Sequence, residues 1–212
     1  MQSNQIQNKK AVLVGVEFPE NRDFALDMEE LFGLCQALYI ECCTSISQSL
    51  AREDSATFIG SGKVEEVRSA VLFHEADLVI FQNALSPSQL HNLSKALSVE
   101  VLDRTQVILQ IFAERARSKE AKMQVQYATL QYMLPRLVGL RENLSRQGGS
   151  GGAGLSNRGA GEKKIELDKR KIQEEMAFLR RECKKQEEVR RVKRQKREKS
   201  NITRIALVGY TN

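Results

Sequence analysis

Apolar runs and segments with apolar residues at helical spacing alternate along the first part of the chain. Four runs predict strands: Ala11–Phe18, Tyr39–Ile46, Asp77–Phe81 and Val99–Leu102. Helical spacing lies between them, in Asp23–Leu38, in Val64–Leu72 and after Ser86, an N-cap residue followed by Pro87. Such alternation predicts an α/β subdomain over residues 1–102, with a small, mostly parallel four-stranded sheet covered by helices.

From Asp103 onward the pattern becomes that of two long helices. The first is expected to run to about Leu144, interrupted only by Pro135, and the second to span Glu162–Lys199. Each carries apolar residues at coiled-coil spacing: Met123, Tyr127, Leu130, Leu134 and Leu137 in the first, and Ile165, Ile172, Met176, Leu179 and Cys183 in the second. Two such seams bury each other, which predicts a long antiparallel, coiled-coil-like hairpin over residues 103–200.

Glycine dominates the segment between the two predicted helices. Residues 147–161, QGGSGGAGLSNRGAG, hold 7 of the 13 glycines and no large apolar residue apart from Leu155. A stretch of this composition has almost nothing to bury, so we expect a flexible loop at the tip of the hairpin.

The last twelve positions, 201–212, predict the beginning of another domain. Arg204–Val208 is an apolar strand, and the residues after it, Gly209, Tyr210, Thr211 and Asn212, match the start of a phosphate-binding P-loop. The second glycine, the lysine and the Mg²⁺-binding hydroxyl of that motif would follow Asn212. We therefore expect a nucleotide-binding domain truncated after its first strand, and a fragment that is inactive and holds no cofactor.

Positive charge is concentrated in the second long helix. The net charge of the chain is +6, but residues 162–199 hold 16 Lys or Arg against 9 Asp or Glu, whereas residues 1–161 hold 16 against 18. A one-sided distribution of this kind suggests an anionic partner such as RNA. The alternative, a solvated charged face, fits the composition equally well. Aromatic interleaving is missing from these charges, which argues against recognition of single strands by base stacking.

A second glycine-containing motif, Gly60–Lys63 (GSGK), precedes a helical segment. Glycine turns at helix N-termini can bind anions, so this motif admits a nucleotide site. However, Thr57 stands where a P-loop would have its first glycine, and Val64 follows the lysine in place of a Mg²⁺ ligand. A tight turn that opens the helix is the simpler interpretation.

Several classes of protein find no support in the chain. We see neither a catalytic constellation nor metal-ligand spacing among the four cysteines and two histidines. No apolar run is long enough to span a membrane, and the polar start, MQSNQIQNKK, does not resemble a signal peptide. We therefore expect a cytoplasmic protein with reduced cysteines.

Five strings in order make the chain similar to the HflX family of GTP-binding proteins. They are FIGSGKVEEV, the long DRTQVILQIFAERARSKEAKMQVQYATLQYMLPRL, the glycine-rich loop ending in GAGE, IELDKRKI and IALVGYTN. The resemblance covers the chain from about residue 10 to its end. One departure is Ala160, which stands where the family usually has proline.

The resemblance implies the docking region of a GTPase that binds the large ribosomal subunit and can split ribosomes under stress, using GTP and Mg²⁺ in the full-length protein. The hairpin loop would reach ribosomal RNA near the peptidyl-transferase centre. The residues expected to contact RNA are Arg141, Arg146, Gly148, Gly149, Gly151, Gly152, Gly154, Arg158, Gly159, Gly161, Lys163, Lys164, Arg190, Arg191, Arg194 and Arg197. Two alternatives stay open: a phosphohydrolase site at Gly60–Lys63, and a hairpin that serves as a protein–protein interaction arm.

Overall fold

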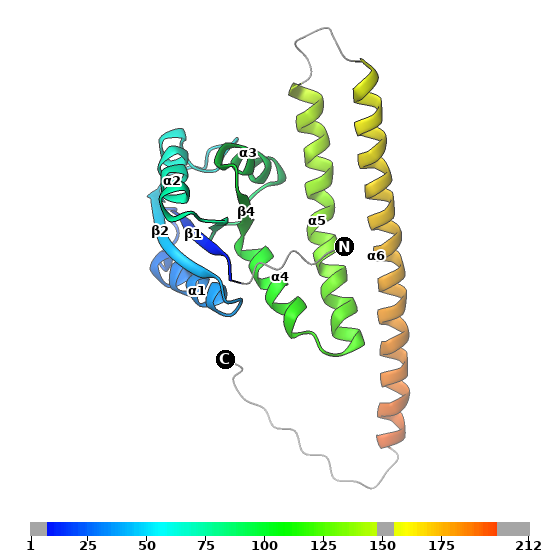
Figure 1. The fold of residues 1–212 in the computed structure, drawn as a ribbon. Helices are drawn as coiled ribbons and strands as arrows, with labels where there is room; N and C mark the ends of the chain where they lie inside the picture. The colour runs from blue at the N-terminus through cyan, green and yellow to red at the C-terminus, as the bar shows by residue number, and fades with distance from the viewer. Residues whose placement is uncertain (1–7, 148–154, 199–212) are drawn as a thin grey trace.

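The computed structural model describes residues 8–147 and 155–198, and the side chains in these ranges except those of 137–147, 155–165 and Lys196. Its centre is a parallel sheet of strand order β2-β1-β3-β4 (Figure 1). The strands are β1 (Lys10–Glu17), β2 (Glu41–Ser49), β3 (Leu78–Phe81) and β4 (Glu100–Asp103). The predicted four-stranded parallel sheet is confirmed.

Helices cover both faces of the sheet. Buried residues of α2 (Ser61–His74) and α3 (Pro87–Leu97) pack with Val12, Val14 and Val16 of β1 on one face. Residues of α1 (Phe24–Gln36) and α4 (Arg104–Arg115) pack with the alternate residues Ala11 and Leu13 on the other. Both faces of β1 are therefore buried, and this explains why its sequence is an almost unbroken apolar run.

Strand β2 extends further than the sequence predicted. It covers Glu41–Ser49 rather than Tyr39–Ile46, and most of its residues are exposed or half-buried. The strand lies at an edge of the sheet and pairs with β1 alone. Backbone hydrogen bonds to β1 continue through the polar residues 47–49, where no apolar pattern could indicate a strand.

The single helix predicted from Asp103 to Leu144 is wrong: the structure has two, α4 and α5 (Lys119–Gln147). Ala116 ends α4 in an extended conformation, and the hydroxyl of Ser118 accepts a hydrogen bond from the Ala121 N–H at 3.0 Å, which caps α5. The break lets the chain reverse, so that α5 passes beside α3 and α4 (Figure 1).

The predicted hairpin is formed by α5 and α6 (Leu155–Glu198), which run antiparallel side by side (Figure 1). Among the described side chains, one buried cluster joins them, with members Met123, Leu130, Ile172 and Leu179, against which pack Tyr127, Leu134, Met176 and Cys183. These eight residues confirm the predicted seams. The remaining two seam positions, Leu137 and Ile165, lie outside the described side chains.

The glycine-rich loop is shorter than expected. Helix α6 begins at Leu155 instead of Glu162, so Arg158, Gly159 and Gly161 lie in its first turns. Leu155 is the one large apolar residue of the segment, and glycine costs only about 1 kcal/mol in a helix, so a helical run can extend through it. The predicted loop residues 148–154 and the predicted strand and P-loop residues within 201–212 lie outside the described residues.

Candidate nucleic-acid interface

The face of α6 that carries the apolar seam becomes cationic toward the C-terminal end of the helix. After Leu179 and Cys183 the same helical spacing gives Gln186 and Glu187, and then a set of cationic residues, namely Arg190, Lys193, Arg194 and Arg197. Each is exposed, whereas Leu179 is only 4% exposed. The change occurs where α6 passes the first turn of α5 and loses its partner helix (Figure 1).

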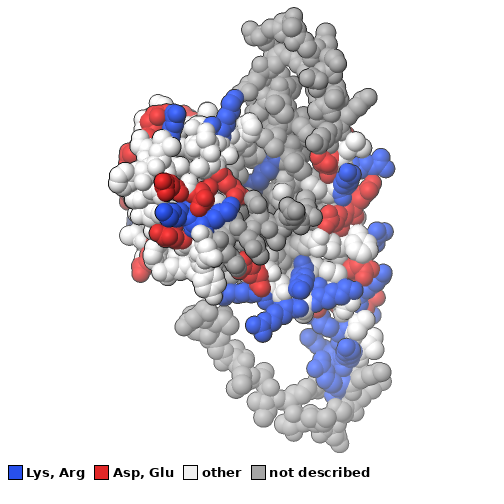
Figure 2. All heavy atoms as spheres, in the orientation of Figure 1, with Lys and Arg blue, Asp and Glu red and all other residues white. Residues whose placement is uncertain are grey.

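An ion pair marks this transition. The Arg190 guanidinium lies 2.5 Å from a carboxylate oxygen of Glu120 in the first turn of α5. Arg190 therefore links α6 to the first turn of α5 and also adds positive charge to this end of α6. Beyond it, Figure 2 shows Lys and Arg side chains gathered over the C-terminal part of α6, whereas acidic and basic residues are mixed over the α/β subdomain.

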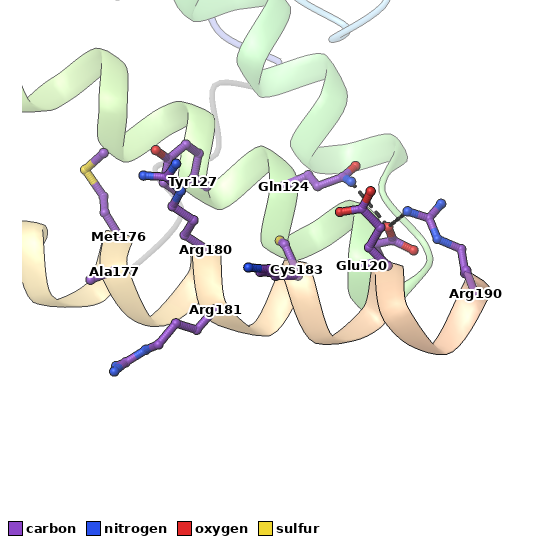
Figure 3. Close-up of a pocket in the computed structure, with 11 residues that line it drawn as sticks. Glu120, Gln124, Tyr127, Met176, Ala177, Arg180, Arg181, Cys183 and Arg190 are labelled. Carbon is purple, nitrogen blue, oxygen red and sulfur yellow. Dashed lines mark hydrogen bonds and ion pairs between the residues drawn. The ribbon is translucent and has the colours of Figure 1, made fainter. Parts of the chain in front are cut away.

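A groove of about 890 Å³ lies between the two helices next to this charged end (Figure 3). From α5 it is lined by Glu120, Gln124 and Tyr127. From α6 come apolar and cationic side chains, Met176, Ala177, Arg180, Arg181, Cys183, Lys184 and Arg190, together with Glu187. Four cations against two carboxylates leave the groove with a positive balance, which favours an anion over a cation as ligand.

Tyr127, a residue of the predicted seam, gives the basic helix an aromatic neighbour. The ring lies in the groove near Arg180 of the facing helix (Figure 3). These two residues are far apart in sequence, and only the antiparallel pairing brings them together. The interpretation that aromatic residues are absent from the basic region was therefore incomplete.

The predicted RNA-contacting residues divide into two groups. Arg190, Arg191, Arg194 and Arg197 lie on the C-terminal part of α6 with exposed side chains. The others lie at the opposite end of the hairpin, where the structure describes helical backbone at Arg141 and Arg146 in α5 and at Arg158, Gly159, Gly161, Lys163 and Lys164 in α6. The remaining ones, Gly148, Gly149, Gly151, Gly152 and Gly154, fall outside the described residues, as do Gly209, Tyr210, Thr211 and Asn212. The structure does not bring the two groups together.

The Gly60–Lys63 motif forms the start of α2. Gly60 is the N-cap residue, and its N–H donates to Oε1 of Gln48 at 3.4 Å. The Lys63 ammonium lies 2.6 Å from the Glu66 carboxylate one turn further along the helix. These contacts account for the motif as a helix-opening turn, without a ligand.

A second polar constellation joins the hairpin to the sheet. Asp103, at the end of β4, is fully buried, and its carboxylate accepts hydrogen bonds from the N–H groups of Gln106 and Leu85 and from the Tyr132 hydroxyl. The Arg136 guanidinium pairs with the same carboxylate at 3.0 Å. Burial raises the pKa of Tyr132, and its hydrogen bond to Asp103 raises that pKa further, so this phenol stays protonated and donates to Asp103.

Two further properties of the described residues bear on possible partners. In the described part of the chain, no helix has the length and apolar character needed to cross a membrane. The same residues contain no group of three or more His, Cys, Asp or Glu side chains placed to hold a metal ion.

With this geometry established, two family models match the chain in succession. Residues 25–113 match the N-terminal region of GTP-binding GTPases, and residues 115–197 match the middle region of the same proteins. The boundary between the two models falls at the end of α4, where the α/β subdomain gives way to the hairpin.

Curated relatives agree with these models. The chain is 39% identical over 204 residues to the GTPase HflX of Lacrimispora saccharolytica and 37% identical over 204 residues to that of Escherichia coli (strain K12). Each comparison covers 96% of this chain but 47% of the relative. The chain thus spans about half the length of the relatives it matches.

Solved structures show the same fold. The GDP complex of SsGBP superposes with a TM-score of 0.62 over 86% of this chain and 45% of that one, at 21% identity. A GTP-binding protein from Sulfolobus solfataricus in complex with GDP gives a TM-score of 0.52 over 81% of this chain and 46% of that one, at 22% identity. At such identities the likeness concerns the fold alone.

Fold, charged hairpin and family models together define the N-terminal and middle regions of a GTP-binding protein. The chain belongs to the HflX family of GTPases.

Proposed function

We propose that this chain is the RNA-docking part of a ribosome-associated GTPase and that its target is the large ribosomal subunit. One observation carries the proposal: the seam face of α6 continues as Arg190, beside the first turn of α5, and then as Lys193, Arg194 and Arg197. Membership of the HflX family supports the same conclusion.

This cationic face suits the phosphate backbone of RNA for a physical reason. Four cations within two turns of one helix face form a row about 10 Å long, at a rise of about 1.5 Å per residue. Each phosphate contact releases condensed counterions, so binding to such a row is strong at low salt and falls steeply as salt increases. Tyr127, in the adjoining groove, adds an aromatic surface close to these charges.

The glycine-rich tip would make a second contact at the other end of the hairpin. In this proposal residues 148–154 reach ribosomal RNA near the peptidyl-transferase centre, with Arg146 and Arg158 on either side as phosphate contacts. Glycines allow the backbone to approach RNA closely. The two contacts would be separated by most of the length of the hairpin, so RNA would be bound along the arm rather than in one pocket.

In this proposal the nucleotide binds to a part of the protein that lies outside the described residues. In the longer protein the segment that begins with Arg204–Val208 and Gly209–Asn212 would form the first strand and P-loop of a domain binding GTP with Mg²⁺. A bound ribosome would then favour the nucleotide state that matches the docked conformation, because ligands shift a conformational equilibrium only by their differential affinity. Ribosome splitting under stress, in the cytoplasm, is the proposed outcome.

The first test reverses the charge of the seam face while sparing Arg190, which holds Glu120. We expect Lys193→Glu combined with Arg194→Glu to weaken co-sedimentation with purified large ribosomal subunits by about tenfold at low salt. The slope of log affinity against log salt should also flatten by about 0.9 for each lost contact.

A control variant lies on the same helix. Lys171→Glu with Lys185→Glu changes the net charge equally, but on the face of α6 that carries Phe178, where both side chains are exposed and neither lines the groove. We expect it to retain most of the affinity. Equal losses in both variants would show that net charge matters rather than this face, and unchanged sedimentation of the first variant would contradict RNA docking by α6.

The protein–protein alternative makes a different prediction. If α6 is an interaction arm for a second copy, light scattering will show a dimer in the absence of RNA. Self-pairing about Phe178 on the outward face would place Lys171 opposite Lys185 and Glu174 opposite Glu182, and like charges at these positions disfavour it. We therefore expect a monomer.

A further inference from the structure

Among the described side chains, no buried apolar cluster spans the joint between the hairpin and the α/β subdomain. Among the described side chains, buried apolar residues form three clusters: one on each face of the sheet and one between α5 and α6. None of the three contains residues from both α5 and the sheet or its covering helices. Yet α5 lies directly against α3 and α4. The polar contacts described for this joint are therefore the ones that can be examined for a role in fixing the direction of the hairpin.

Polar contacts of three residues occupy this joint. Asp103 comes from the end of β4, and Tyr132 and Arg136 come from successive turns of α5. Arg136 pairs with Asp103 at 3.0 Å and also donates to the Leu85 carbonyl at 3.2 Å, which lies just before α3. The guanidinium carbon lies 3.3 Å from the centroid of the Tyr132 ring. The cluster thus connects α5 to both the sheet and the α3 side of the molecule.

Burial makes these contacts specific for one orientation. Asp103 is 0% exposed and the Arg136 side chain is 18% exposed. A buried carboxylate has no water to replace a lost partner, so any rotation of α5 that separates it from Arg136 is strongly opposed. Apolar surfaces are much less directional, because sliding exchanges one contact for another. A polar joint therefore selects a direction where an apolar one would allow several.

We propose that Asp103, Tyr132 and Arg136 are positioning residues that hold the hairpin in one direction relative to the α/β subdomain. The connector between α4 and α5, residues 116–118, is the point about which the hairpin would turn if they were released. The functional consequence rests on the proposed RNA docking: contact made along α6 would be transmitted to the α/β subdomain as a rigid-body displacement.

The cluster brings together the two ends of the long sequence string DRTQ…LPRL. Asp103 opens the string and Arg136 stands next to its end, with the break between α4 and α5 between them. The chain leaves the sheet at Asp103, reverses, and returns Arg136 to the same point. The ion pair between Asp103 and Arg136 therefore joins the two ends of this segment.

Spin-label distances test the proposal directly. Labels attached through a ketone-bearing unnatural residue at positions 68 and 181 leave the four native cysteines untouched, and both positions are exposed. We expect one narrow distance distribution in the 212-residue chain. Asp103→Asn retains a side-chain oxygen to cap α4 but removes the charge, and it should widen the distribution at least twofold. Arg136→Met should do the same, and the double variant should be no wider than either single one.

A control breaks a more exposed ion pair inside the α/β subdomain. Arg104 of α4 pairs with Glu30 of α1 at 2.7 Å, so Glu30→Gln removes a charge from a contact that does not cross the joint. We expect its distance distribution to match the wild type. If Asp103→Asn does not fold, Tyr132→Phe and Arg136→Lys test the positioning role instead. Each removes some of the contacts among the three residues, so each should widen the distance distribution to a smaller extent.

The outcomes separate this proposal from RNA docking. A distribution as narrow in the folded Asp103, Tyr132 and Arg136 variants as in the wild type would overturn the positioning role. Lys193→Glu with Arg194→Glu should leave the distances unchanged and weaken RNA binding alone. Wide distributions in the joint variants together with no RNA affinity in any protein would therefore uphold the positioning role and reject the docking function.

Discussion

Gly15, at the centre of β1, shows how a single residue sets the distance between a strand and its covering helix. A Cβ atom at this position would lie 2.4 Å from Sδ of Met28 and 2.8 Å from Cζ of Phe24. Helix α1 can approach the sheet this closely because glycine leaves the space free. Gly33, on α1 itself, differs: a Cβ there would meet nothing within 4 Å.

The two glycines predict opposite effects of the same substitution. Gly15→Ala should destabilise the protein by about 1–3 kcal/mol, because α1 must shift to avoid overpacking. Gly33→Ala should stabilise it by about 0.5–1 kcal/mol, because alanine restricts the unfolded chain and favours the helix. Urea unfolding followed by circular dichroism measures both. Equal shifts of the two midpoints would contradict the packing argument.

Single residues also decide how well the helix ends could be predicted. Ser86 and Pro87 were expected to open a helix, and the structure confirms a capping box in which the Gln89 side chain also accepts from the Ser86 N–H. Asp103 forms an equivalent capping box with Gln106, which sequence reasoning did not point out although it began the helical pattern at Asp103.

At the scale of elements, α5 and α6 depend on one seam. Leu130 is 2% exposed and Leu179 is 4% exposed, and both belong to the cluster between the helices. The other faces of α6 are largely charged and contribute little burial. Phe178 is 53% exposed on the side turned away from the seam. Neighbouring residues of one helix thus differ sharply in what they contribute to stability.

Alanine substitutions measure this difference. Leu130→Ala should cost about 2–5 kcal/mol, because it removes buried methyl groups and leaves a cavity between two helices. Phe178→Ala should change the stability by no more than about 0.5 kcal/mol, as is usual for exposed positions. The free energy of unfolding of each variant can be measured by chemical denaturation followed by circular dichroism of the helices. Equal losses of stability in the two variants would contradict the packing of the seam.

Across the whole molecule, stability is divided between two units. The sheet with its four helices has two apolar cores of its own, and the hairpin has a third. Polar contacts of Asp103 with Tyr132 and Arg136 cross the joint between the two units, and we propose that they fix its direction. A molecule built in this way need not unfold in a single step, because the loss of one core does not expose the other.

Hydrogen exchange in increasing urea tests this division. We expect the amides of α5 and α6 to lose protection at lower urea than those of β1 and β3. Leu130→Ala should lower the transition of the helices alone, whereas Val79→Ala, in the sheet, should lower that of the strands alone. Loss of protection in all four elements at one urea concentration would instead indicate a single cooperative unit.

The sequence by itself determined the elements that bury a periodic apolar face. The parallel strands, both seams of the hairpin and the position of the positive charge could all be inferred, because each depends on neighbours close in sequence or on a repeating spacing. Only the tertiary structure decided the polar edge of β2, the break between α4 and α5, and the meeting of Asp103 with Arg136. These features arise from backbone pairing, capping and contacts between distant segments, which leave no periodic signal in the order of the residues.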